Sequence, residues 1–388
     1  MVNAVYDHII AILVVCVMFV SAVVILPTLS ITSFKAVDQQ QLRNTALNIF
    51  NAMLLDTGEP VDWGSDPFFS FDKVSKFGLA RAGDSIFYVL DPDKVQRLVK
   101  GNPIGELPYY KVKELLKLQG YDFAFQIIPP FNITNVGGTK IDEYHSPINE
   151  PLLSQKKLQY AIKVSDLYGR PIPNAVIQGT AIYTDKNKFY LTNLGKTTTN
   201  AVGIAEDTID LESVPWHLMV ILRVSVADVA TVVVTFGKNP VKVIDINIAG
   251  DTVILTRPKD APNAAVEIKN VYVYGSQGDL SFLYKGQGPP YDKFNTGSGQ
   301  HRLWNHTFNG LQDYDPIVLI FHIETVPEGQ SGGWQDVVVA GPYQAFLGHT
   351  VFNYGSPPQG GGAIRLQRSV NIAGLTYIAE LWLWKESP

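Results

Sequence analysis

The sequence predicts a mainly β fold with an N-terminal transmembrane helix, in which a small α+β module is followed by two β-sandwich domains. Three observations predict it. The stretch from Ile9 to Leu26 carries no charge and is long enough to cross a bilayer as a helix. Residues 36–131 mix helix and strand signals. Beyond them, short runs of alternating apolar and polar residues are separated by Gly- and Pro-rich loops, as in antiparallel sheets. The predicted divisions are an anchor (1–35), an α+β module (36–131), a linker (132–157), a first sandwich (158–257) and a second sandwich (264–388).

The composition indicates which partners are disfavoured and what stabilises the fold. Of the 388 residues, 46% are hydrophobic and 17% are charged, so hydrophobic cores can be built unaided. The net charge is −5 and no run of Lys or Arg occurs, which argues against nucleic acid or an anionic lipid surface as the main partner. Cys16, the single cysteine, lies within the apolar stretch. Neither an intrachain disulfide nor a cysteine-based metal site is therefore expected.

The apolar stretch favours an uncleaved anchor. Cys16 and Ser21 are its only hydrophilic side chains, so it lacks the polar stripe of a helix in a globular core. The alternative is a cleaved secretory signal, which needs a positively charged start. Residues 1–8 contain no Lys or Arg. We therefore expect Ile9–Leu26 to remain as a membrane-spanning helix.

The orientation signals conflict. Lys35 and Arg43 follow the span and favour a cytoplasmic C-terminal side. Two N-glycosylation sequons, which begin at Asn132 and Asn305, favour the outside, as do the β-rich modules. Long domains are translocated largely regardless of flanking charge. We expect the C-terminal domains to be extracellular, with Asn132 and Asn305 as candidate glycosylation sites.

The α+β module is predicted from an apolar helical face, two helix starts and one alternating strand. Five apolar residues fall on one helical face: Leu42, Ala46, Ile49, Phe50 and Met53. Asp91 followed by Pro92 is typical of a helix start, and Pro108 opens another helix. Residues 121–127 alternate as a half-buried strand. We expect the helix at 42–53 to lie on the sheet of this module.

The first 58 residues resemble the long first helix of type IV pilins, in which an apolar half leads into an amphipathic half. That resemblance implies packing of the apolar half in a filament core or a membrane. The chain lacks the basic leader that a prepilin peptidase needs. A plain anchor followed by a domain's first helix is thus the alternative. The stretches LRNTALNIFNAMLLDTGEPVDWGS and GYDFAFQIIPPFN resemble uncharacterised archaeal membrane-anchored surface proteins. This second resemblance implies no activity.

The first predicted sandwich carries the most specific motifs. Leu158, Tyr160, Ile162 and Val164 alternate with their neighbours as in a half-buried strand. Asp166 to Gly169 is expected to turn one strand into the next, Val176 to point into the core, and Asn200 to Gly203 to form another tight turn. Further strands are predicted at 219–226, 229–236 and 241–248, ending near residue 255. The motifs are similar to bacterial Ig-like and carboxypeptidase-regulatory-like β-sandwich repeats over residues 158–256, through the runs VSD (164–166), GRPI (169–172), NAV (174–176) and TTNAVGIA (198–205). Such modules space, present or adhere, and rarely catalyse.

The second predicted sandwich is Ig-like or jelly-roll-like. Its β-type runs are 266–274, 280–284, 317–325, 337–339, 344–352 and 364–384. The segment Leu381-Trp382-Leu383-Trp384 is expected to be the last strand with alternate residues buried. An exposed edge open to pairing is the sharper alternative.

Possible catalytic and metal-binding residues have simpler explanations. Gly329–Gly333 matches the nucleophile elbow G-x-S-x-G, with Asp336 and His349 downstream, but β patterns on both sides predict a hairpin loop instead. His322 and Glu324 share one face of a strand, where a metal pair competes with a packed histidine.

Acidic residues of the kind that binds Ca²⁺ also have local explanations. Asp91 and Asp93 fit helix capping, and Asp185 with Asn187 fits a turn. We therefore assign no catalytic, cofactor-binding or metal-binding residue.

The predicted function is that of a non-enzymatic cell-surface structural or adhesive protein. Ile9–Leu26 would anchor it in a bilayer or join copies of it in a homo-oligomer or filament. The alternative is a surface carbohydrate-binding protein or hydrolase with its site on the C-terminal sandwich. Four aromatic residues would then form a sugar platform: Trp304, Trp334, Tyr343 and Trp384. Exposure of these rings together, rather than separate burial, would favour the alternative.

Overall fold

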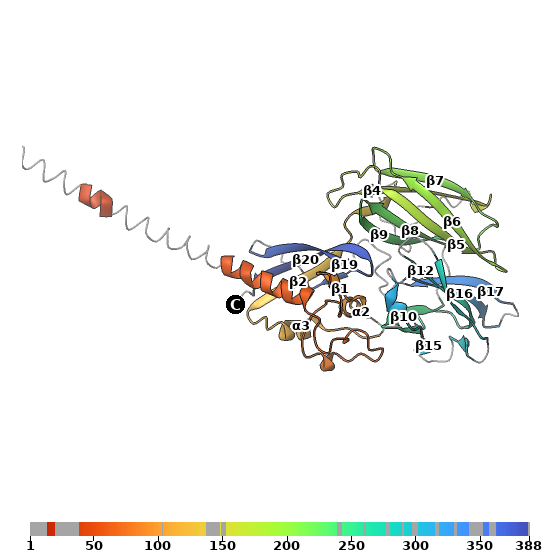
Figure 1. Ribbon diagram of the computed structural model, residues 1–388, viewed down its shortest axis with the longest axis horizontal. Helices are drawn as coiled ribbons and strands as arrows, with labels where there is room; N and C mark the ends of the chain where they lie inside the picture. Colours follow the sequence, from red (N-terminus) through yellow and green to blue (C-terminus); the bar gives the residue numbers. More distant parts are fainter. Residues whose placement is uncertain are drawn as a thin grey trace, which may run out of the picture.

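The computed structural model describes residues 14–19, 39–102, 104–136, 148, 153–238, 243–258, 261–275, 280–288, 291–296, 302–314, 318–329, 332–340, 352–356 and 362–386. Within these residues the strands form five sheets, which build three modules (Figure 1). The first module contains one sheet and the helices. The second and third modules contain two sheets each. The mainly β fold class is thereby confirmed.

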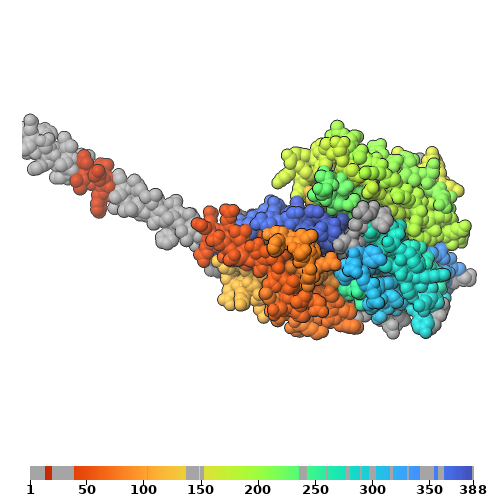
Figure 2. Space-filling view, viewed as in Figure 1, coloured from red at the N-terminus to blue at the C-terminus, as the bar shows by residue number. Residues whose placement is uncertain are grey.

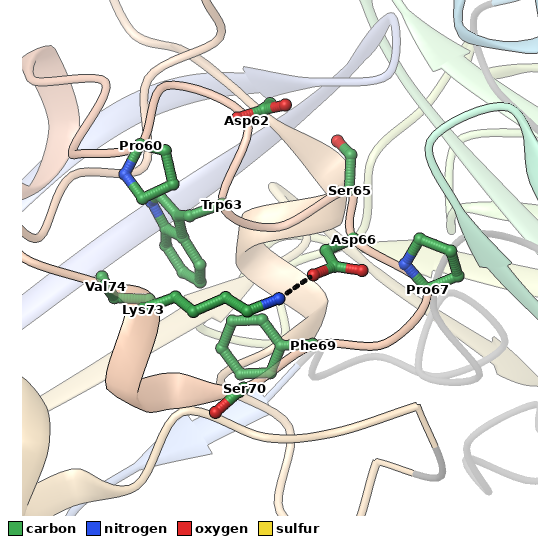
Figure 3. A pocket seen from close by; sticks show the side chains of 10 residues that line it. All are labelled: Pro60, Asp62, Trp63, Ser65, Asp66, Pro67, Phe69, Ser70, Lys73 and Val74. Carbon is green, nitrogen blue, oxygen red and sulfur yellow. Dashed lines mark hydrogen bonds and ion pairs between the residues drawn. The ribbon is translucent and has the colours of Figure 1, made fainter.

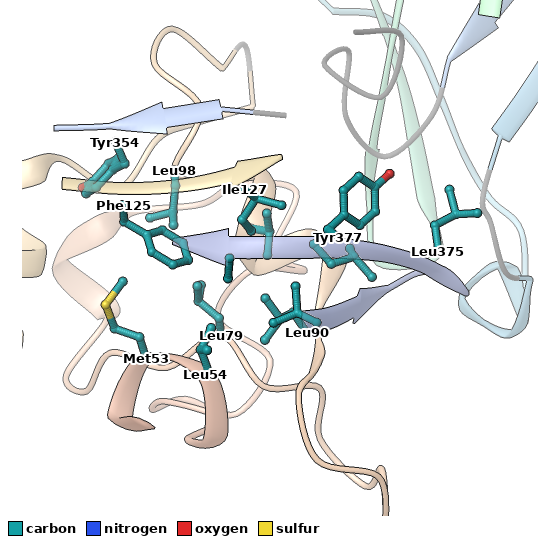
Figure 4. Close-up of a cluster of buried hydrophobic side chains, with 14 of the residues drawn as sticks. Met53, Leu54, Leu79, Leu90, Leu98, Phe125, Ile127, Tyr354, Leu375 and Tyr377 are labelled. Atoms are coloured by element: carbon teal, nitrogen blue, oxygen red, sulfur yellow. The ribbon is translucent and has the colours of Figure 1, made fainter. Parts of the chain in front are cut away.

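The first module is a five-stranded sheet with helices against one face. Its strand order is β1-β19-β20-β2-β18. A helix over residues 39–55 packs on this sheet through the predicted apolar face, and Figure 4 shows Met53 of this helix on the same side of the sheet as Phe125. Phe50 meets Phe125 edge to face with ring centroids 6.5 Å apart. The elements are β1 (Val89–Leu90), β2 (Tyr121–Ile128), β18 (Phe352–Tyr354), β19 (Ile364–Ile372), β20 (Leu375–Lys385), α2 (Pro92–Gln96), α3 (Tyr109–Leu115) and the 3-10 turn η1 (Phe71–Lys73).

The local helix signals are confirmed. The Asp91 carboxylate accepts hydrogen bonds from the backbone N–H groups of Asp93 and Lys94, so Asp91 caps α2, and Pro92 occupies the first turn. Pro108 is the N-cap residue of α3. The predicted strand at 121–127 is β2.

The C-terminal strands belong to the first module, so the prediction that residues 264–388 form one second sandwich is wrong. β20 pairs antiparallel with β2 from Tyr121↔Lys385 to Ile128↔Ile378, and β19 pairs with β1 and β20. The second and third modules are thus inserted between β2 and β18. Alternation along residues 364–384 marks strands and their buried face, but it carries no information on the partner strand.

β20 has a strand on each side, which excludes the exposed-edge alternative for residues 381–384. Leu381 and Leu383 are fully buried, whereas Trp382 and Trp384 are half-buried. The predicted alternation of burial along this last strand is confirmed.

The second module is a sandwich of the sheets β3-β4-β7 and β6-β5-β8-β9. The predicted inward set, Leu158, Tyr160, Ile162 and Val164, is buried. The strands are β3 (Asn132–Asn135), β4 (Lys157–Ser165), β5 (Val176–Thr184), β6 (Phe189–Thr198), β7 (Ile204–Asp210), β8 (His217–Val226) and β9 (Val229–Lys238).

Three predictions about this module need correction. Residues 132–135, assigned to a linker, form β3 and pair with β4. Residues 245–249, assigned to this sandwich, form a strand of the third module. Val176 is half-exposed, while Ala175 and Ile177 are buried, so the burial is out of phase with the prediction by one residue. A hydrophobic run shows that a strand is buried but not in which of two adjacent sandwiches.

Two predicted turns of the second module are confirmed. The backbone N–H of Gly169 donates to the carbonyl of Asp166 at 3.0 Å, and that of Gly203 donates to Asn200 at 2.9 Å. Gly203 has φ +75°, and an added Cβ would lie 2.5 Å from the carbonyl oxygen of Val164. Glycine is therefore required at this turn because the neighbouring strand approaches so closely.

The third module is a second sandwich, with sheets β10-β11-β15 and β13-β12-β16-β17, and with β14 paired to β12. Its strands are β10 (Asp245–Ala249), β11 (Thr252–Thr256), β12 (Ala264–Tyr274), β13 (Leu280–Lys285), β14 (Lys293–Asn295), β15 (Arg302–Thr307), β16 (Val318–Pro327) and β17 (Trp334–Ala340). A short 3-10 turn, η2 (Leu311–Asp313), follows β15.

One buried hydrophobic cluster joins all three modules. It contains Phe125 of the first module, Ile221 of the second and Ile320 of the third. In Figure 2 the C-terminal residues lie between the N-terminal helix and the second module. The three modules form one head, by which we mean the described residues from 39 onward.

The predicted membrane span lies outside the described residues except at 14–19. These six residues are helical and lie away from the head (Figure 1). Their large apolar side chains are exposed, from 49% for Val14 to 70% for Phe19. Among the residues that the structure describes, no helix is long and apolar enough to cross a membrane.

Candidate functional site

The described part of the first module contains a cavity of about 370 Å³ beneath the loop that follows the first helix (Figure 3). Gly58, at φ +73°, lets the chain turn back after the helix. The buried Trp63 ring forms one wall. Its Nε1 donates to the carbonyl of Gly78 at 3.1 Å, and its ring packs 6.0 Å from Phe69. The lining residues are Pro60, Asp62, Trp63, Ser65, Asp66, Pro67, Phe69, Ser70, Lys73 and Val74.

Arg97 fixes the loop that lines the cavity through hydrogen bonds to its backbone. Its fully buried guanidinium donates to the carbonyls of Gly64 at 2.9 Å and Asp66 at 2.7 Å, and its Cζ lies 4.8 Å from the Phe69 ring centroid. Burial lowers the pKa of Arg97 to about 10, against the opposing effect of Asp93. At neutral pH this group stays charged, and its hydrogen bonds fix the loop backbone.

The lining of the cavity carries an ion pair, and one lining residue, Ser65, is hydrogen-bonded to a buried acid behind it. Lys73 Nζ lies 3.0 Å from Asp66 Oδ2, and the N–H of Phe68 together with Lys73 lowers the pKa of Asp66. Ser65, on the wall, donates to Asp93 Oδ2 at 2.9 Å. None of the lining residues is a His or a Cys. This mixture of rings, prolines and one ion pair could hold a small group.

Asp93 lies behind the cavity at the junction with the third module. Besides the Ser65 hydroxyl, its carboxylate accepts from Gln96 Nε2 at 3.0 Å and from the backbone N–H of Gly250, in the β10–β11 turn, at 2.8 Å. Gln96 Nε2 also donates to the carbonyl of Ile248 at 2.7 Å. Burial, and then the nearby Asp91, raises the pKa of Asp93 to about 7.

The acidic residues weighed as calcium ligands have hydrogen-bond partners within the protein. Asp91 caps α2, as the capping interpretation predicts, and Asp93 bridges two modules. Asp185 accepts from the backbone N–H groups of Asn187 at 3.0 Å and Lys188 at 2.9 Å, which confirms the turn. The Tyr190 hydroxyl lowers the pKa of Asp185 to about 2.

The strands on either side of the nucleophile-elbow match pair as a hairpin. Residues 329–333 connect β16 to β17, which pair antiparallel. Asp336 binds His217 of the second module instead, with Oδ1 2.5 Å from Nδ1. Ser331 and His349 lie outside the described residues.

His322 is a packed histidine. It shares a face of β16 with Glu324, as predicted, and its ring stacks on Phe189 with centroids 4.5 Å apart. Its two nitrogens lie 3.1 Å from Asn270 Nδ2 and 2.5 Å from Gln335 Oε1. Burial lowers the pKa of His322 to about 4. The structure places no group of three or more His, Cys, Asp or Glu side chains fit for a metal among the residues it describes.

The three described members of the predicted aromatic platform do not come together. Trp304 lies on β15, Trp334 on β17 and Trp384 on β20, which belong to three different sheets. Trp304 Nε1 donates to the buried Asp292 at 3.2 Å, so this ring serves the core of the third module. Tyr343 lies outside the described residues.

The two sequons differ in accessibility. Asn305 is exposed on β15, at the edge of its sheet. Asn132 is half-buried on β3, and its Nδ2 donates to the carbonyl of Asp166 at 3.2 Å. Glycosylation stays a prediction at both, and Asn305 offers the freer amide.

One feature of the sequence marks the loop that lines the cavity. Residues 60–70 hold a Trp, two Phe, two Pro and two Asp between a helix and a strand, a density of rings and turns typical of a folded loop. No comparable signal marks Asp93, because an acid in the first turn of a capped helix is ordinarily explained by the helix dipole.

Comparisons with known proteins give distant matches only. Neither the protein-family models nor the curated proteins contain a match. Among solved structures, the chain is similar to the tetra-tandem repeat in the extending region of a large adhesion protein, at a TM-score of 0.20 and 12% identity, over 57% of this chain and 50% of that one. It is also similar to trypsin-activated α-2-macroglobulin from Escherichia coli, at a TM-score of 0.18 and 10% identity, over 55% of this chain and 18% of that one. The chain thus spans less than two thirds of the length of either.

Proposed function

We propose that this protein is a non-enzymatic structural or adhesive component of a cell surface, held by its N-terminal apolar helix and displaying the three-module head. The observation that carries the proposal is the buried cluster shared by all three modules and the helix over residues 39–55. A helix fixed in the common core moves with the head as one body. It can therefore transmit a force or a position from the anchor to the head.

The docking of this helix is tight along its length. Ala46, Phe50, Met53 and Leu54 are each at most 1% exposed. Each large buried side chain contributes about 1.5–3 kcal/mol. The helix is therefore an integral part of the head.

The exposed segment 14–19 supports attachment through the N-terminus. Five of its side chains are large hydrophobics with 49% to 70% exposure. Removing all five from water would contribute roughly 10 kcal/mol. A bilayer or copies of the same helix would supply that burial, and the choice between them decides between an anchored monomer and a filament.

The insertion topology suits a mechanical role. The second and third modules lie between β2 and β18, so the chain leaves the first module and returns to it. A pull on the N-terminal helix first loads the five-stranded sheet, whose strands β2 and β20 pair over eight residues. The inserted modules are connected to this sheet at both ends, through β2 and through β18.

Shearing membranes from the native source tests the proposal. Released material is pelleted without detergent and imaged by negative-stain electron microscopy. Regular filaments would support assembly through Ile9–Leu26, and retention until detergent is added would support a bilayer anchor. A variant without residues 9–26 should be soluble and monomeric. The proposal fails if this variant still sediments with membranes or polymerises.

A further inference from the structure

The first-module sheet has a second face, opposite the helix over residues 39–55, with a distinct chemistry. Leu381 and Leu383 of β20 are fully buried in the common core, so Trp382 and Trp384 project from the other side. Both tryptophans are half-exposed. Strand register places further side chains beside them. We call this surface the tryptophan face and define it by Gln126, Arg365, Gln367, Glu380, Trp382 and Trp384.

The tryptophan face is ordered in rows across three strands. One row is Ala124, Trp382 and Arg365, in which the Arg365 Cζ lies 5.3 Å from the Trp382 ring centroid. The next row is Gln126, Glu380 and Gln367. Rows on one face of a sheet are about 6.6 Å apart, since they are two residues apart along the strand. An aromatic row and a polar row thus lie about one sugar ring apart.

Glu380 fixes the polar side chains. It is 0% exposed, and it accepts from Gln126 Nε2 at 2.7 Å, from Arg365 Nη2 at 2.5 Å and from Gln367 Nε2. A buried carboxylate without such partners would cost several kcal/mol. These bonds orient the two amides and the guanidinium. Arg365 and Gln367 remain exposed.

We propose that the tryptophan face binds a neutral polysaccharide chain. A sugar ring has an apolar face of C–H groups, which a half-exposed indole can cover, and a rim of hydroxyls, which amides and a guanidinium can bond. Arg365 is neutralised by Glu380, so the face has no excess of positive charge for a polyanion. The polar row equally disfavours a purely apolar partner. This activity goes beyond the structural role proposed above.

Affinity electrophoresis tests this binding with the full-length chain in a mild detergent. Native gels would contain a soluble neutral polysaccharide (a β-glucan, an α-glucan or a mannan) and, in parallel, alginate as a polyanion. We expect one or more of the neutral gels to retard the protein, with little effect of added salt. Alginate should not retard it.

Single substitutions then locate the site. Trp382→Ala and Trp384→Ala should each weaken binding about tenfold, the loss of one stacked ring. Trp384→Phe should retain part of it. Trp216→Ala is the matched control, because Trp216 is a 38% exposed tryptophan on the second module. Thermal unfolding of each variant checks that the head is intact.

Three results would overturn the proposal. The first is the absence of retardation in all three neutral polysaccharides. The second is retardation that Trp216→Ala abolishes as strongly as Trp382→Ala. The third is a change of sedimentation coefficient in Trp382→Ala without a change in retardation, which would make the face a contact between copies. None of these depends on the membrane or filament test.

Discussion

The third module meets its two neighbours through junctions of different chemistry. Toward the second module, β17 runs against β5 and β8, and the contact is mostly apolar. It also contains the buried hydrogen bond between His217 and Asp336 and a backbone hydrogen bond from Gln335 N–H to the carbonyl of Lys186 at 2.9 Å. Toward the first module, the junction is more polar, although Ile104 packs with Ala249 and Ile254 in a small apolar cluster. Asp93 binds Gly250, and Arg81 Nη2 donates to the carbonyl of Gln312 at 2.7 Å.

The two junctions should therefore differ in how strongly their stability depends on pH. Apolar burial hardly changes with pH, so the contribution of the apolar contacts between the second and third modules should persist across a wide pH range. A buried carboxyl with a pKa near 7 makes the other junction depend on pH in the neutral range. The junction with the second module thus provides stiffness, and the stability of the junction with the first module can change with pH.

The largest effect should come from the buried His217–Asp336 pair in the apolar junction. His217→Leu leaves the Asp336 carboxylate, 1% exposed, without its side-chain partner, and we expect a loss of about 3 kcal/mol or more in the free energy of unfolding. Urea denaturation measures it. The double variant His217→Leu/Asp336→Leu should recover most of the loss. If the double variant is as unstable as the single one, the pair is not the source of the cost.

The apolar part of that junction should follow closely in size. Ile320→Ala removes a fully buried side chain from the cluster shared by the modules, and we expect a cost of about 2–5 kcal/mol. Ile86→Ala is the matched control, since Ile86 is 69% exposed and its loss should stay within about 0.5 kcal/mol. Similar midpoints for the two variants would contradict the shared core.

The polar junction should respond to pH through Asp93. The carboxyl has an ordinary pKa of 3.8 when unfolded and about 7 when folded, so between these values the folded head holds a proton that the unfolded chain releases. This contribution to stability is present in full below pH 4 and is lost as the pH rises through 7, at up to about 1.4 kcal/mol per pH unit. Urea midpoints measured from pH 4 to 8 should therefore fall.

Two variants isolate this titration. Asp93→Asn stays neutral, so its stability should vary less over the same range. Asp91→Asn removes the neighbouring charge but keeps a side chain that caps the helix, so the fall should persist. An unchanged slope in Asp93→Asn would assign the pH dependence to another group.

What the sequence predicts well is local. The helix over residues 39–55, the cap at Asp91, the alternation of Leu158 to Val164 and the turn at Gly203 each depend on neighbours within a few residues. Each was predicted from periodicity or turn chemistry. The same locality explains why the sequence predicts a turn at Asp185 and a packed side chain at His322.

What it fails to predict is long-range pairing. β20 alternates as cleanly as any strand of a sandwich, and only its pairing with β2, across the whole inserted part, assigns it to the first module. The tryptophan face depends on the same pairing, because Gln126 and Glu380 meet only when β2 and β20 lie side by side. Asp93 likewise gains its role from a turn in another module.

The smallest effect we expect concerns a single neutral hydrogen bond of the polar junction. Gln312 Nε2 donates to the carbonyl of Gly250 at 2.6 Å, next to the N–H that binds Asp93. Gln312→Ala should cost about 1 kcal/mol, the contribution of one such bond. Gln119→Ala, at an exposed glutamine of the first module, is the control and should be neutral. Because the bond is uncharged, the cost should be the same at pH 5 and pH 8 if Asp93 alone titrates in the junction. A cost that grows with pH would instead mean that Gln312 helps hold Gly250 against the ionised Asp93, and that the two hydrogen bonds at this turn act together.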